Sequence, residues 1–153
     1  MRAPNRAISV RPATTADIGR LCEFADAFLV KMQSKATAKD ARQVYQHILK
    51  HPDAGIIIVA EHKSGICGYC YTSYEWRSEF AGEAMHCVEL FVEESWRRKG
   101  VAAALLTSLI DTAKRRGIRR ISADVHPGNS TIERLLESMG FDPEHRTMWS
   151  LPL

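Results

Sequence analysis

The 153-residue sequence has a hydrophobic content of 45%, a charged content of 25% and a formal net charge of +3. It is long enough to form one domain with a substantial core, which we take to span residues 1–153. No apolar run approaches the ~20 residues needed to cross a membrane, residues 1–6 lack the apolar core of a signal peptide, and the mild charge does not call for nucleic acid. We therefore expect a cytoplasmic protein.

The first half of the chain predicts a strand, two helices and a β-hairpin. The alternating segment Ile8–Pro12 is typical of a strand, and Thr14-x-x-Asp17 is a capping-box pattern that begins a helix extending to about Met32. A second apolar-periodic helix ends before Pro52. The hairpin strands and the polar loop that we expect after them are Ile56–Glu61, Ile66–Tyr74 and Glu75–Ala84.

The second half alternates strands and helices. The apolar run Val88–Val92 predicts a buried strand, and the helix Val101–Arg116 follows a short polar turn, with Gly117 as its left-handed stop. A capping box, Ser130-x-x-Glu133, predicts the start of the last helix. The two remaining strands are expected at Arg120–Val125 and His145–Leu153.

The start of the helix at Val101 has an unusual charge. No Ser, Thr, Asp or Asn precedes it as a cap, and three cations, Arg97, Arg98 and Lys99, lie at the positive end of its dipole, where each costs roughly 0.3–1 kcal/mol. Free amides together with these cations favour a phosphate site. Gly100 and the small side chain that follows would let an anion approach the backbone closely. The alternative interpretation is a solvated basic turn.

Arg97-x-x-Gly100-x-Ala102 resembles the Gln/Arg-x-x-Gly-x-Gly/Ala signature of the GNAT superfamily of N-acetyltransferases, and it has the same context of a strand before it and a long helix after it. A second pattern of the family, Asn-x-x-Ala-x-x-Leu-Tyr-x-x-x-Gly-Phe, is matched in part near the C-terminus. Its positions here are Asn129, Ile132, Leu135, Leu136, Gly140 and Phe141, so that Ile replaces Ala and Leu replaces Tyr.

The resemblance implies a mixed α/β acetyltransferase (GNAT) fold in which the parallel fourth and fifth strands splay apart and receive acetyl-CoA. The pyrophosphate would bind the basic turn, and the pantetheine would pair with the fourth strand through the backbone of Leu90 and Val92. The complete set of residues that it implies for cofactor binding is Leu90, Phe91, Val92, Arg97, Arg98, Lys99, Gly100, Val101, Ala102, Ala103 and Asn129.

The implied reaction is acetyl transfer to a primary amine of a small molecule or a protein, and the amine must lose a proton before it attacks. Glu89 lies where related members often carry an acidic residue, and His86 lies where others carry a glutamate base. Alternation along a regular strand would place the two on opposite faces. Glu89, His86 and water all remain candidates for the base, and Leu136 cannot supply the proton that the usual tyrosine gives the leaving thiol.

Two alternative functions, the absence of a metal and a possible homodimer complete these expectations. The same fold could bind acyl-CoA without turnover, as a sensor, or its basic turns could bind nucleic acid, although stacking motifs for that are missing. No metal is expected, because Cys67 and Cys70 would point to opposite faces of a strand and no second ligand pair follows. The resemblance also allows a homodimer, and it does not name the acceptor.

Overall fold

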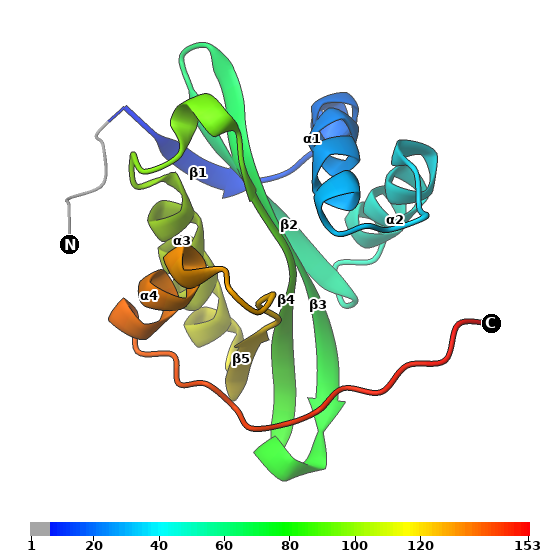
Figure 1. Ribbon diagram of the computed structural model, residues 1–153, viewed down its shortest axis with the longest axis vertical. Helices are drawn as coiled ribbons and strands as arrows, with labels where there is room; N and C mark the ends of the chain where they lie inside the picture. The colour runs from blue at the N-terminus through cyan, green and yellow to red at the C-terminus, as the bar shows by residue number, and fades with distance from the viewer. Residues whose placement is uncertain (1–6) are drawn as a thin grey trace.

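The computed structural model describes residues 7–153 and has a five-stranded sheet in the order β1-β2-β3-β4-β5 (Figure 1). Adjacent strands are antiparallel except β4 and β5, which are parallel, so the predicted mixed α/β fold is confirmed. The strands are β1 Ser9–Pro12, β2 Gly55–His62, β3 Gly65–Arg77, β4 Gly82–Val92 and β5 Arg120–Ala123. The helices are α1 Ile18–Lys31, α2 Ala38–Lys50, α3 Val101–Arg116 and α4 Ser130–Ser138.

Two hydrophobic clusters lie on the two faces of the sheet. Helices α1 and α2 cover one face, and α3 and α4 cover the other (Figure 1). Strand β2 contributes to both clusters, because Ile57 packs towards α1 and α2 while its neighbour Ile58 packs towards α3. Burial on both faces explains why this strand reads as a continuous apolar run instead of an alternating one.

The ends of the predicted helices follow local side-chain chemistry. The Thr14–Asp17 capping box is present, although it closes a 3₁₀ turn, Thr15–Asp17, directly before α1. Gly117 has φ +77° and ends α3 as predicted. The capping box predicted at Ser130 is wrong. The Glu133 amide donates to the carbonyl of Asn129, so Asn129 is the cap and Ser130 is already helical.

The segment predicted as a loop at 75–84 is instead the tip of a long β-hairpin. Strand β3 continues to Arg77, a 3₁₀ turn at Ser78–Phe80 follows, and β4 begins at Gly82. Cross-strand pairs such as Glu75 with Ala84 extend the ladder to the tip. Polar residues are compatible with a strand here, because an antiparallel ribbon at the margin of a sheet can face water.

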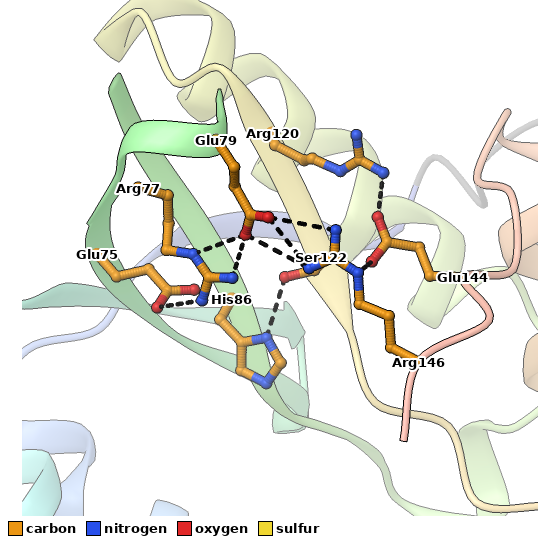
Figure 2. A network of polar contacts seen from close by, with 8 residues as sticks. All are labelled: Glu75, Arg77, Glu79, His86, Arg120, Ser122, Glu144 and Arg146. Carbon is orange, nitrogen blue, oxygen red and sulfur yellow. Dashed lines mark hydrogen bonds and ion pairs between the residues drawn. The ribbon is translucent and has the colours of Figure 1, made fainter. Parts of the chain in front are cut away.

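The last predicted strand, His145–Leu153, is absent, and this part of the chain is irregular (Figure 1). Side-chain ion pairs hold its beginning against the hairpin tip and β5. Arg146 contacts Glu79 at 3.4 Å, and Glu144 pairs with Arg120, as Figure 2 shows. Beyond Arg146 the apolar side chains are exposed, because no strand edge pairs with them; they are Met148, Trp149, Leu151 and Leu153.

We expect Glu79→Gln to loosen the C-terminal segment without unfolding the protein. Arg146 would lose its partner across the hairpin, while exposed ion pairs contribute only ~0–1 kcal/mol each to stability. Hydrogen exchange in residues 142–153 should therefore become faster, with a change in Tm of at most a few degrees. Glu23→Gln, which removes the exposed Arg20–Glu23 pair, is the matched control. Unchanged exchange would mean that other contacts hold this segment.

Candidate active site

Strands β4 and β5 separate halfway along β4. Their parallel pairing joins Ala84–Cys87 to Arg120–Ala123 and stops there, whereas β4 continues to Val92. The separation coincides with a β-bulge, because Tyr71 pairs with Glu89 and Thr72 pairs with Cys87, which leaves Val88 without a partner in β3. A bulge bends its strand and raises the local twist. The second half of β4 is thus open on the side where β5 would lie.

The backbone of this open half carries groups suited to pairing with a ligand. The Glu93 amide donates to the Cys67 carbonyl of β3 over 2.9 Å. The backbone N–H and C=O groups of every second residue before Glu93 therefore also point towards β3. The backbone N–H and C=O groups of the alternate residues, Leu90 and Val92, point to the open side. Consistently, the Val92 carbonyl accepts a 3.1 Å bond from Arg97 Nε instead of a bond from β3. Phe91, also predicted as a cofactor contact, pairs with Tyr69 of β3.

The start of α3 is uncapped by any side chain, as predicted. The first helical bond runs from the Ala104 amide to the Gly100 carbonyl, which leaves the amides of Val101, Ala102 and Ala103 without intrahelical acceptors. Gly100 has φ +84°, and a Cβ added there would meet no protein atom within 4 Å. The side of Gly100 on which a side chain would lie is therefore open.

The three cations before this helix are exposed, but two of them make local contacts. Arg97 is tied to the end of β4 through Val92, and Lys99 Nζ lies 5.2 Å from the centroid of the Trp96 ring. Arg98 has φ +58°, a left-handed conformation that costs a non-glycine residue roughly 1–2 kcal/mol. Open amides, local strain and positive charge fit the pyrophosphate of acetyl-CoA.

Asn129 lies before α4, where the chain leaves β5. Parallel strands end at the same edge of a sheet, so the loops before α3 and α4 emerge on the same side of the molecule. The Asn129 carbonyl caps α4, and its amide donates to the His126 carbonyl over 3.1 Å. Its predicted contact with the cofactor remains a prediction.

The Glu89 carboxylate is bonded to two buried tyrosines. Its Oε2 accepts hydrogen bonds from Tyr45 Oη, at 2.6 Å, and from Tyr69 Oη, at 2.7 Å. Tyr45 comes from α2 and Tyr69 from β3, and both side chains are fully buried. Hydrogen bonds to a charged group contribute about 1.5–3 kcal/mol each. The side-chain partners of Glu89 are thus two neutral phenols and not a cation.

Both phenols remain protonated, and this decides the direction of the two bonds. Burial, followed by the negative charge of Glu89, raises the pKa of Tyr45 and of Tyr69 above that of an ordinary phenol. Each tyrosine is thus a donor, and the carboxylate is the acceptor. Tyr45 is part of the hydrophobic core, with no exposed surface. Its contact with Glu89 was missed, because 44 residues separate the two in sequence.

His86 lies where β4 still pairs with β5, and both of its ring nitrogens have partners. Nδ1 is 3.1 Å from Ser122 Oγ (Figure 2), and Nε2 is 3.1 Å from the exposed carboxylate of Asp124. Both partners are side chains, one on β5 and one just after it. Two partners at this distance fix the orientation of the imidazole ring.

The prediction that Glu89 and His86 face opposite sides of the sheet is wrong. Met85 and Cys87 pack towards α3, so His86 between them points to the other face. The bulge at Val88 then shifts the alternation by one residue, and Glu89 also points to that face, towards Tyr45 and Tyr69. For the same reason Leu90 packs towards α3 and not with His86. Both candidate bases thus serve one side of the sheet.

A second bulge corrects the expectation for the cysteines. The register shift after Ala60 places Cys67 and Cys70 in the same cluster beneath α3, not on opposite faces. All four cysteines are free thiols, and the sulfurs of Cys70 and Cys87 lie 3.3 Å apart. The hydrogen bond between the Cys70 and Cys87 thiols, followed by burial, raises the pKa of Cys70. Within residues 7–153, no group of three or more potential ligands is arranged to hold a metal ion.

The separated parallel strands and the uncapped start of α3 agree with the fold that the sequence resemblance implied. A family model described as "Acetyltransferase (GNAT) family" matches residues 21–141. The chain therefore belongs to the GNAT family of acetyl-transferring enzymes.

Several proteins that are named as N-acetyltransferases are similar to almost the whole chain. The phosphinothricin N-acetyltransferase of Streptomyces viridochromogenes is 21% identical over 143 residues, which cover 92% of this chain and 78% of that protein. An aminoglycoside N-acetyltransferase in complex with CoA has a TM-score of 0.81 at 16% identity, covering 95% of this chain and 94% of the other. A ribosomal-protein-alanine N-acetyltransferase from Brucella melitensis biovar Abortus 2308 has a TM-score of 0.77 at 15% identity, with coverages of 96% and 99%.

Proposed function

We propose that this protein transfers the acetyl group of acetyl-CoA directly to a primary amine of a small molecule or a protein. The observation that carries the proposal is the open half of β4, which leads to the uncapped start of α3. The backbone of Leu90 and Val92 would pair with the pantetheine, as an added strand pairs with an edge. The amides of residues 101–103 and the cations before them would hold the pyrophosphate.

Glu89 is the proposed proton acceptor. Acetyl-CoA supplies an acetyl thioester, and the acceptor amine attacks it only after losing a proton. The phenols of Tyr45 and Tyr69 both end on Oε2, so Oε1 is the oxygen available for that proton or for contact with the amine. His86 points to the same face and, with Asp124 beside it, is the second candidate for this role.

The transfer is proposed to be direct, without a cysteine relay. Cys87 is 6% exposed and packs beneath α3, on the face opposite to Glu89. Leu136 is also buried there and has no proton to donate. A thiol leaving group has a pKa near ~8.5, far below that of an alcohol, so a thiolate departs with little assistance. Water and the free amides at the helix starts can stabilise it.

The relatives suggest which acceptors to try first. Their names mention phosphinothricin, aminoglycosides and the alanine of a ribosomal protein. We propose one catalytic domain over residues 1–153 that acts in the cytoplasm. None of the helices within residues 7–153 is long and apolar enough to span a membrane. Residues 1–6, on which the argument about a leader rests, lie outside the described part of the chain.

Acetyl-CoA at 100 times its Kd should raise the Tm by roughly 5–10 °C, because it binds only the folded state. Thiol release should then accelerate with at least one amine in a panel of polyamines, amino acids, aminoglycosides, phosphinothricin and peptides. The corresponding alcohols, which lack the amine, are the control acceptors. A rise in Tm without thiol release from any amine would favour the alternative function, an acyl-CoA-binding module without turnover.

A further inference from the structure

Three oxygen atoms from three elements meet beside the open half of β4. Tyr45 Oη and Tyr69 Oη lie 2.6 and 2.7 Å from Glu89 Oε2, and the two phenol oxygens lie 3.0 Å from each other. Tyr45 lies on α2, 44 positions before Glu89 in the sequence, whereas Tyr69 lies on β3, the hairpin partner of β4. This triangle is the only place in the described chain where two buried side chains donate to one carboxylate oxygen.

The available protons determine how the triangle is bonded. Each phenol has one proton, and both can point at Oε2 only while that oxygen carries a lone pair for each. The two phenol oxygens then face each other at 3.0 Å with no proton between them, an arrangement that the carboxylate charge holds in place. A proton taken up by Glu89 at Oε1 leaves both bonds to Oε2 intact.

The aromatic rings around the triangle fix the positions of the two hydroxyl groups. The Tyr45 and Tyr69 rings meet edge to face at a centroid distance of 6.0 Å, and Phe24 stacks on Tyr69 at 6.2 Å. Phe91, two residues after Glu89, also contacts Tyr69 and Phe24. Since buried rings of this size cannot turn without moving their neighbours, the hydroxyls are preorganised donors.

We propose that Tyr45 and Tyr69 are positioning residues for the acetyl transfer, which fix the Glu89 carboxylate by Oε2 and direct Oε1 to the acceptor amine. This inference rests on the proposed function of Glu89. The two tyrosines do not touch the acceptor and act only through the carboxylate. The same arrangement holds Glu89 before and after it takes the proton, so the carboxyl group does not have to reorient during turnover.

A double-mutant cycle tests the proposal, because residues that act through one another are not additive. Tyr69→Phe and Tyr45→Phe should each lower kcat by about 10-fold to 100-fold, as expected for a lost bond to a charged group, with the Kd of acetyl-CoA unchanged. In a Glu89→Gln background the same substitutions should change kcat by less than about twofold. Tyr71→Phe is the matched control, since Tyr71 lies on the same face but its hydroxyl forms none of the bonds to Glu89.

The free energy of unfolding of the same variants, measured in urea, distinguishes a failure of the positioning role from a failure of the proposed function. Coupling between each tyrosine and Glu89 in stability, in a protein that acetylates no amine, would overturn the proposed function and leave the triangle as a structural group only. Equal losses of kcat from Tyr→Phe with and without Glu89 would overturn the positioning role, while turnover itself would uphold the proposed function. An effect of Tyr71→Phe as large as that of Tyr69→Phe would also overturn it.

Discussion

Acetyl-CoA should bind the Gly100→Asp variant at least ~100-fold more weakly than the unchanged protein, since a like charge facing the pyrophosphate costs several kcal/mol. The substitution places a carboxylate at the residue directly before the free amides of α3. The fold should survive, because a side chain at Gly100 has open space and Asp tolerates φ values such as +84° better than most residues. Calorimetric titration measures the Kd, and thermal unfolding without ligand confirms the fold.

Gly117→Asp is the matched control for this experiment. Gly117 has φ +77°, has open space above its Cα, and ends the same helix. The variant therefore introduces the same charge and a similar backbone strain 17 residues away, at the other end of α3, and should leave the Kd of acetyl-CoA unchanged. Gly100→Asn separates strain from charge and should have an intermediate affinity. An unaltered Kd for Gly100→Asp would show that the cofactor binds elsewhere.

Glu89→Gln should lower kcat with amine acceptors by about 10²–10⁴-fold, the range expected when a positioned proton acceptor is lost. Glutamine keeps the size of the side chain and an oxygen for the phenols, but its amide does not take up a proton at neutral pH. The Kd of acetyl-CoA should stay within about twofold, because the cofactor would pair with the backbone of β4 and not with this side chain. Steady-state thiol release and calorimetry measure the two quantities.

Two variants make the result for Glu89 specific. Glu83→Gln removes another carboxylate of β4, one paired with Arg116 at 2.8 Å on the α3 side, and should keep full turnover. His86→Gln tests the second candidate base. Full turnover in Glu89→Gln together with a large loss in His86→Gln would reassign the proton to His86 and its partner Asp124.

Much of the fold follows from local patterns in the sequence. In α1, α2 and α3 the side chains that face the sheet are apolar and recur every 3.6 residues. This spacing can be read from the sequence alone. Gly117 is similarly predictable, because few other residues adopt its left-handed conformation cheaply. A missing helix cap can also be predicted, because it depends only on the residues directly before the helix. The structure confirms that no side chain caps α3 after Arg97, Arg98 and Lys99.

The errors occur where pairing between distant segments overrides the local pattern. Residues 75–77 and 82–84 form strands because they pair with one another across the hairpin, and residues 145–153 form none because no strand edge pairs with them. The bulge at Val88 is also a property of the β3–β4 pair. It reverses the alternation of β4, and with it the predicted relation between Glu89 and His86.

The sequence by itself therefore determined the order of the elements, the family resemblance and the basic turn, since each depends on residues close together in the chain. Only the tertiary structure decided how Glu89 is bound. Its partners, Tyr45 and Tyr69, come from α2 and β3, and they read as ordinary core aromatics in sequence. A hydrogen bond between side chains depends on distance in space, and 20 or 44 residues of intervening chain carry no local signal of it.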